Sequence, residues 1–182
     1  MRSSGAGPRV PVRGRCTRIR RRTPLALGAA LALAPALAGP PAARPLADKT
    51  LVAWVCPADA VQRGGSVVTL MEGEDFDAIV LGERVPGRWM AGSDFFRRTQ
   101  DEAAQAENPQ ETADPGVFVQ IAIAYAGDRI TIYRNGRQYA DYTAAEPRPF
   151  GGGAAVLLGL RYLGDMGEIG FFAGAIDEAR IY

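Results

Sequence analysis

Short runs of alternating apolar and polar residues begin at residue 48 and continue to the end of the chain, separated by Gly, Pro, Asn or Asp. In VFVQIAIAYA (117–126), Ile121, Ile123 and Tyr125 alternate with smaller or polar residues. A period of two residues is typical of a strand with one buried face. Similar runs lie at 50–55, 66–70, 76–82, 88–92, 129–134, 137–143, 154–160 and 171–182. Without any long helical period, this pattern predicts an all-β antiparallel domain, most economically a two-sheet sandwich.

The sharpest turn signal is Asn135-Gly136, which lies between RITIYR (129–134) and RQYADYT (137–143). A type I′ turn needs positive φ at both central residues, and Asn-Gly meets this requirement best. We therefore expect a hairpin that joins these two runs.

The longest stretch without strand character is the polar segment 97–116, which ends at Pro115-Gly116. Its DEAAQAE sequence (101–107) predicts a short helix. Loops of this length in a compact domain are usually functional or disordered.

The N-terminal residues favour an export signal. RIRRR (18–22) precedes the apolar run LALGAALALAPALA (25–38), whose last three residues have the small-x-small form of a cleavage site. A membrane span would need about 20 apolar residues. We therefore expect 1–38 to be a cleavable export signal peptide and the Pro-rich residues 39–47 to be a linker. The remaining domain, 48–182, is predicted to be periplasmic or extracellular.

Charge is unevenly distributed along the chain. Residues 1–47 contain nine Arg and no acid, whereas residues 48–182 contain 12 Lys and Arg against 20 Asp and Glu, a net charge of −8. Nucleic acid and anionic lipid attract clustered cations. The composition therefore predicts a secreted module with no nucleic-acid partner.

The chain contains no histidine. This removes Ser-His-Asp and Cys-His catalysis, histidine proton relays and ordinary zinc sites. Cys56 is the only cysteine after the predicted signal peptide, so the domain has no internal disulfide and depends on its core. Carboxylate chemistry and oxygen-ligated metals such as calcium remain open.

Glycosidases use two carboxyl groups, about 5 Å apart in retaining enzymes and about 6.5–9.5 Å apart in inverting enzymes. Neither the acids of residues 72–77 nor Asp94 belongs to a sequence motif that would supply such a pair. We interpret the acids of EGEDFD (72–77) as solvated turn residues and do not assign Asp94 as a nucleophile. Asp177 is expected to have a paired structural role. Calcium needs about six to eight oxygen ligands, and the acids that could supply some are Asp75, Asp77, Asp165 and Glu168. No catalytic residue, metal ligand or cofactor is assigned.

Three blocks resemble a known family. TLVAWVCPAD (50–59), IAIAYAGDRITIYRNGRQYADYT (121–143) and FFAGAIDEARIY (171–182) are similar to the opening strand, central hairpin and closing strand of laminin-G-like domains. This resemblance implies a concanavalin A-like jelly roll over residues 48–182, with the last strand beside the first.

Parts of the chain also resemble one particular kind of laminin-G-like domain. Residues 62–70, 76–100 and 111–136 are similar to the laminin-G-like module that precedes the catalytic domain in some bacterial family 32 glycoside hydrolases of the levanase and invertase type. The resemblance implies a non-catalytic accessory module that binds polysaccharide or oligosaccharide, with a catalytic domain downstream. The alternative is a protein–protein or architectural module without a glycan ligand.

Sugar binding requires an exposed aromatic platform beside planar polar groups. The predicted carbohydrate-binding residues are Trp89, Tyr162, Arg161 and Tyr133, because each ring adjoins an arginine in the sequence and the first two lie near strand or loop ends. Core packing is the competing interpretation for each ring. Trp54, which has apolar neighbours within 50–55, is assigned to the core.

Overall fold

The computed structural model describes residues 44–144, 146–164 and 170–182. The predicted signal peptide (1–38) and most of the predicted linker (39–47) lie outside these residues. The described residues form two antiparallel sheets, which confirms the predicted all-β sandwich. Among them, no helix is both long enough and apolar enough to cross a membrane.

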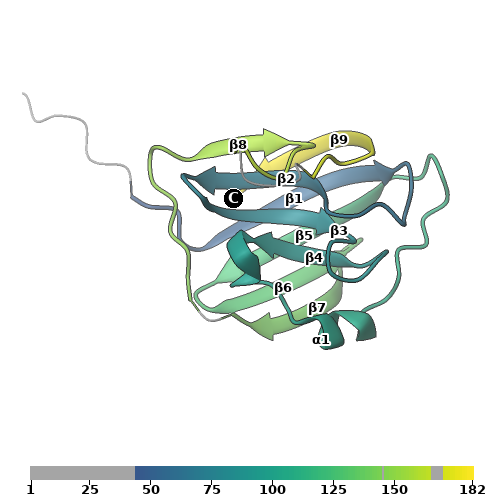
Figure 1. Cartoon of the computed structure of the whole chain (residues 1–182), viewed down its shortest axis with the longest axis horizontal. Coiled ribbons are helices and arrows are strands. Elements are labelled where there is room, and N and C mark those ends of the chain that lie inside the picture. The colour runs from purple at the N-terminus through teal and green to yellow at the C-terminus, as the bar shows by residue number, and fades with distance from the viewer. Residues whose placement is uncertain (1–43, 145, 165–169) are drawn as a thin grey trace, which may run out of the picture. The chain divides into compact units, whose positions relative to one another are not determined.

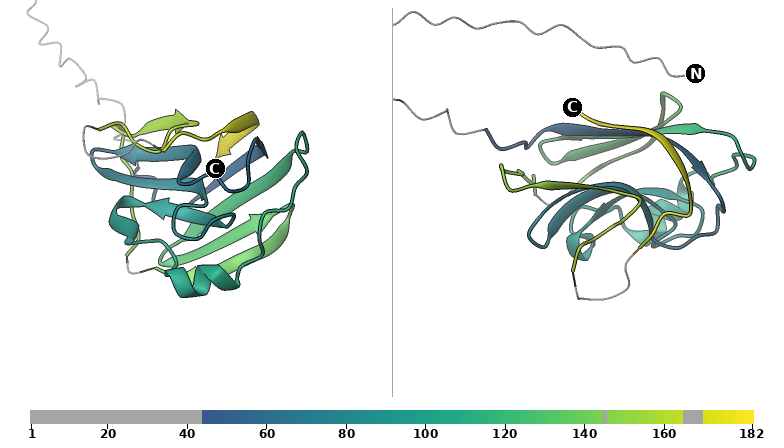
Figure 2. Two further views of the ribbon diagram at one scale, coloured as in Figure 1. Left: turned by 45° about the vertical axis from the view of Figure 1, so that its right-hand side comes forward. Right: turned by 90° about the horizontal axis from the view of Figure 1, so that it is seen from above.

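One sheet has five strands in the order β7-β6-β5-β1-β9, and the other has four in the order β4-β3-β2-β8. The first sheet comprises β7 (Arg137–Thr143), β6 (Arg129–Arg134), β5 (Val119–Ala126), β1 (Lys49–Pro57) and β9 (Gly174–Ile181). The second comprises β4 (Trp89–Ser93), β3 (Asp75–Leu81), β2 (Gly65–Glu72) and β8 (Ala155–Leu158). Figure 1 shows β8 and β9 together at the upper edge, and β7 with the short helix α1 (Glu102–Glu107) at the lower edge. The right-hand view of Figure 2 shows the two sheets as separate layers.

The first and last strands are neighbours, as the resemblance implied. β1 pairs with β5 on one side and with β9 on the other, so that Leu51 lies opposite both Ile123 and Ile181. Thr50 and Tyr182 exchange two backbone hydrogen bonds of 2.9 and 3.0 Å. The predicted closing strand therefore lies beside β1 as β9, at the edge of the five-stranded sheet among the described residues.

The alternation of apolar residues decides which side chains fill the space between the sheets. Every second residue of a strand points to the same face, so β1 turns Leu51, Ala53 and Val55 inwards. The buried core that they join includes Val68, Leu70, Ile79, Leu81, Trp89, Ile121, Ile123, Tyr125, Ile130, Ile132 and Phe150. Burial of one such large apolar side chain contributes about 1.5–3 kcal/mol.

The predicted hairpin joins β6 to β7 through Asn135 and Gly136, whose φ values are 49° and 74°. The side-chain Oδ1 of Asn135 accepts a hydrogen bond of 2.8 Å from the backbone N–H of Gln120. The turn is thereby fixed to β5, the neighbour of β6.

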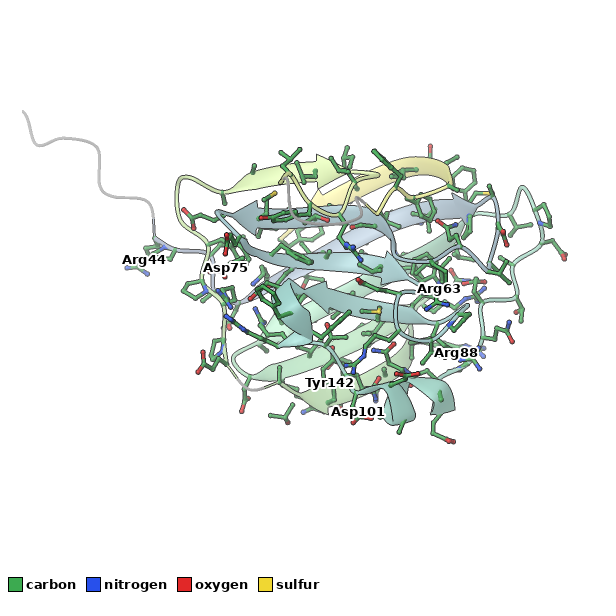
Figure 3. The ribbon with its side chains drawn as sticks, viewed as in Figure 1. Arg44, Arg63, Asp75, Arg88, Asp101 and Tyr142 are labelled. Carbon is green, nitrogen blue, oxygen red and sulfur yellow. The ribbon has the colours of Figure 1, made fainter. Side chains whose placement is uncertain are left out.

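The polar segment after β4 closes the edge of the sandwich between β4 and β7. The Asp101 carboxylate caps α1 by accepting a hydrogen bond from the backbone N–H of Ala104. Tyr142 of β7 donates to the carbonyl oxygen of Arg98 at 3.0 Å, and Figure 3 shows Tyr142 and Asp101 close together at this edge. The segment predicted to be functional or disordered is therefore an ordered part of the sandwich.

Candidate functional site

Trp89 lies in the core and is 0% exposed. It occupies one of the inward positions of β4, and its indole Nε1 donates a hydrogen bond of 2.6 Å to Oε2 of Glu111. Its backbone N–H donates to the hydroxyl of Tyr139. The prediction that Trp89 offers a sugar-binding surface is wrong, because no face of the ring reaches solvent.

Glu111 is the centre of this buried polar cluster. Its carboxylate accepts two hydrogen bonds from the guanidinium of Arg134, at 2.9 and 2.6 Å, besides the one from Trp89. Backbone N–H groups of Thr112 and Ala113 donate to Oε1. These contacts fasten the segment after α1 to β4 and β6.

Acid should weaken the domain in part through Glu111. Burial alone would raise its pKa, but hydrogen bonds from Arg134, Trp89 and the N–H of Ala113 outweigh burial and hold the pKa below its ordinary value of 4.5. A lowered pKa stabilises the folded state above the pKa of the unfolded chain, and this stabilisation is lost as the pH falls through the folded value. In denaturation series from neutral pH to about pH 3, Glu111→Gln should therefore lose unfolding free energy less steeply than the wild type. Equal slopes in the two proteins would contradict this role.

Arg161 and Tyr162 lie on the segment after β8, on the outer side of the four-stranded sheet. Arg161 forms an ion pair with Glu83. The ring of Tyr162 packs on Phe76, with centroids 6.2 Å apart. Phe76 in turn covers a small apolar cluster, Ala78, Val80 and Met90, that is separate from the main core.

Tyr133 lies on the opposite side of the molecule. It is half-buried on the outer face of the five-stranded sheet, where it pairs in register with Ala122. Of the four predicted carbohydrate-binding residues, Arg161 and Tyr162 therefore lie on one side of the molecule and Tyr133 lies on the other. Trp89 lies in the core between them.

Trp54 lies on the same outer face as Tyr133, which makes its assignment to the core wrong. The ring is half-buried, and the Arg180 guanidinium carbon lies 5.7 Å from its centroid. Arg180 also donates to the carboxylate of Glu178 at 2.6 Å and to the hydroxyl of Tyr182 at 2.9 Å. These bonds hold the cation beside the indole face, an attractive arrangement.

Trp54, Tyr133, Arg180 and Tyr182 together are called the outer platform. Trp54 pairs with Gln120 and Tyr133 with Ala122, two residues further along β5. Strands lie about 4.8 Å apart and rise about 3.4 Å per residue, so the Cα atoms of Trp54 and Tyr133 are separated by about 12 Å. The side chains of Gln120 and Ala122, on the same face of β5, lie between the two rings.

The outer platform has the groups that recognise sugars. Ring faces of Trp and Tyr accept the apolar C–H face of a pyranose or furanose, while their polar tips and the Arg180 guanidinium can bind hydroxyls. Trp54 is predicted from the sequence to lie in the core because apolar residues flank it on both sides. Alternation places Trp54 on the face opposite Ala53 and Val55, but only its neighbours Gln120 and Glu178 on the paired strands show that this face is the outer one.

Two of the acids considered from the sequence, Asp77 and Asp94, form ion pairs with cations. Asp77 is fully buried between Lys49 and Arg98, so its interpretation as a solvated turn residue is wrong. Asp94 is also buried, and its carboxylate lies 3.2 Å from Arg97. In the described residues, no group of three or more Cys, Asp or Glu could hold a metal ion. The calcium candidates Asp165 and Glu168 lie outside that part of the chain.

Several solved structures share this fold. Domain 4 of a GH43 extracellular arabinanase from Geobacillus stearothermophilus, solved with arabinotriose, is 19% identical over 77% of this chain and 62% of that chain, with a TM-score of 0.53. A SAP-like pentraxin from Limulus polyphemus is 12% identical over 77% of this chain and 65% of that one, with a TM-score of 0.52. Mouse laminin alpha1 domains LG4-5 are 12% identical over 74% and 35%, with a TM-score of 0.52. This chain spans less than two thirds of each.

At these identities the likeness shows the fold alone, and no curated protein matches the chain. A family profile covers most of the sequence: Laminin_G_3, described as the concanavalin A-like lectin/glucanases superfamily, matches residues 35–182. The chain therefore belongs to this superfamily, as the opening, central and closing strands indicated.

Proposed function

We propose that this chain is a non-catalytic module that binds a polysaccharide or oligosaccharide on the outer platform. The observation that carries the proposal is the half-buried Trp54 ring, which lies beside the Arg180 guanidinium on the outer face of the five-stranded sheet. The arabinanase domain that shares this fold was solved with arabinotriose. That ligand belongs to the other protein, but it supports a sugar as the first class of ligand to test.

We further propose that the module is exported and serves a secreted glycoside hydrolase of the levanase or invertase type. The support is the sequence resemblance of residues 62–70, 76–100 and 111–136, together with the features of 1–38 that favour a signal peptide. A catalytic role for this chain itself is disfavoured by the absence of histidine and by the ion pairs that occupy Asp77 and Asp94.

Replacing Trp54 with alanine should weaken glycan binding by about 1–2 kcal/mol, the scale of one aromatic contact. Binding itself should be weak, with Kd roughly 0.1–1 mM, because the outer face of a sheet leaves the sugar partly hydrated. Titration calorimetry against fructans, arabinans and β-glucans provides the measurement. Far-UV circular dichroism of the variant verifies that the sandwich is intact.

Tyr162→Ala is the matched control, because Tyr162 is an aromatic residue on the outer side of the other sheet. Binding to the outer platform predicts that this variant retains the affinity of the wild type. If Tyr162→Ala or Arg161→Ala loses binding while Trp54→Ala retains it, the site lies after β8, and the original sequence prediction for those two residues is correct.

A second candidate function, a protein–protein or architectural module, is favoured by the turn η1 (Asp94–Phe96). Phe95 is 79% exposed and has φ of 47°, an unusual conformation for a bulky residue. The Arg97 guanidinium lies 5.5 Å from its ring centroid. Exposed aromatic and Arg side chains are enriched at protein interfaces. Absence of any glycan binding at millimolar concentration would favour this second function.

A further inference from the structure

Among residues 44–144, 146–164 and 170–182, none covers the edge formed by β8 and β9, whereas the segment after β4 closes the opposite edge. A groove of about 420 Å³ lies between the two strands and is lined by Val68, Val156, Leu158 and 176–181. Val156 and Leu158 of β8 are 53% and 60% exposed. Because their partners in β2 are the core residues Leu70 and Val68, both side chains face the interior of the sandwich and yet reach solvent.

The backbone of β9 is also available at this edge. In the described part of the chain, β9 pairs only with β1. The two bonds between Thr50 and Tyr182 show that Tyr182 points its N–H and C=O towards β1. Since these groups alternate along a strand, Ala179 and Ile181 point theirs away from the sheet. An unpaired edge of this kind is a template for another strand.

We propose that two copies of this chain associate through β9, with the two strands antiparallel and the two-fold axis at Ala179. This register sets the outward-facing backbone groups of Ala179 against the same groups of the second copy. In this register, Glu178 of each copy lies directly opposite Arg180 of the other copy. The dimer therefore contains two such pairs of opposite charges. Opposite charges on directly paired residues stabilise an antiparallel sheet.

Neighbouring registers lack this complementarity. Moving the axis by one residue to Glu178 sets two Glu178 side chains directly opposite each other. Moving it to Arg180 does the same with two arginines. Like charges in directly opposite positions are destabilising, so the charges of β9 select Ala179 as the centre.

The second copy is also a suitable cover for the groove. Ala179 and Ile181 belong to the apolar positions of β9 that pack against the core. In the paired arrangement, these residues of the second copy lie at the mouth of the groove, opposite Val156 and Leu158. The contact therefore removes exposed apolar surface from water on both copies, which favours association.

Pairing through β9 would join the two five-stranded sheets into one continuous sheet. The outer platforms then lie on the same face, with the Cα atoms of the two Trp54 residues about 16 Å apart. If the platform binds glycan, as proposed above, one polysaccharide chain could contact both copies. The association itself does not depend on that function, since oligomeric state is measured without a ligand.

Sedimentation equilibrium of the purified chain tests the pairing. The wild type should dimerise reversibly, with Kd roughly 10–100 µM for a contact of this limited size. Glu178→Arg and Arg180→Glu each turn the two attractive pairs into repulsive ones and should raise Kd by about tenfold or more. Monomeric wild type across the accessible concentrations, or single variants that still dimerise normally, would overturn the proposal.

Mixing the two single variants gives the sharper result. In the mixed dimer, the arginine introduced at position 178 of one chain faces the glutamate introduced at position 180 of the other. The native residues that remain at these two positions also form a pair of opposite charges. An equimolar mixture of Glu178→Arg and Arg180→Glu should therefore dimerise, although each alone is mostly monomeric. The double variant should likewise regain self-association, and failure of both to associate would exclude this register.

The matched control reverses an ion pair at the far side of the same sheet face. Arg129 of β6 and Asp141 of β7 are directly bonded and lie away from β9. Arg129→Glu combined with Asp141→Arg should leave the dimer Kd unchanged. An equal loss of association in this control would mean that general charge, rather than β9 pairing, controls the oligomeric state.

Discussion

Replacing Asp77 with alanine should lower the free energy of unfolding by about 3–5 kcal/mol, because it removes the counter-ion of two buried cations. The Asp77 carboxylate lies 2.8 Å from the ammonium of Lys49 and 2.8 Å from the guanidinium of Arg98. All three side chains are almost completely excluded from water. Without the carboxylate, both cations would remain buried with no opposite charge.

The aromatic residues around the cluster cannot replace the lost carboxylate. Lys49 Nζ lies 4.7 Å from the ring centroids of Tyr125 and Phe150, and the Arg98 guanidinium lies 4.9 Å from that of Tyr125. Such contacts contribute about 0.5–2 kcal/mol each, less than the cost of an uncompensated buried charge. The surrounding core also prevents water from entering freely.

Urea denaturation of Asp77→Ala and Asp141→Ala measures the effect. Asp141 also pairs with an arginine, but its partner Arg129 is exposed, and surface pairs add little to stability. Asp77→Ala should therefore lose far more unfolding free energy than Asp141→Ala. Similar losses in the two variants would show that the buried cluster is not a major source of stability.

Trp89→Ala should also lower the free energy of unfolding by about 3–5 kcal/mol. The substitution leaves a cavity between the sheets and frees the Glu111 carboxylate from its indole donor. Trp89→Phe should be less damaging, because the phenyl ring fills much of the space and only the Nε1 hydrogen bond is lost. The order of stability should be wild type, Trp89→Phe, Trp89→Ala.

Trp54→Ala provides the comparison within the same chain, which has only two tryptophans. Because Trp54 is half-buried on the outer face, its removal should shift the urea midpoint much less than that of Trp89→Ala. Glycan affinity should show the reverse order, with the larger loss in Trp54→Ala. A stable Trp89→Ala variant that fails to bind sugar would contradict both assignments.

The strand pattern alone determined much of the fold. Residues 129–134 and 137–143 were expected as a hairpin and correspond to β6 and β7. Their alternation is strict, and Asn135-Gly136 fixes the turn locally, so distant residues had little to add. The pairing of β1 with β9 joins opposite ends of the domain, and it was expected only from the resemblance of whole strands to a family.

The positions of the two tryptophans were decided by the tertiary structure. Alternation places Trp54 on the same strand face as Val52, and Trp89 on the same strand face as Ala91. When both faces of a strand are apolar, however, alternation does not show which face packs against the core. The other strands decide this. On β1, the polar neighbours Gln120 and Glu178 lie beside Trp54 and mark the outer face.

Asp77 shows the same limit for charge. Its local sequence, EGEDFD, is typical of a solvated turn. No Lys or Arg lies within this stretch to indicate a buried ion pair. Lys49 comes from 28 residues before it and meets it because the two sheets pack face to face, whereas Arg98, 21 residues after it, is brought there by the segment that follows β4. Sequence alternation thus determined the strands, whereas packing between them decided which polar groups had to be neutralised inside.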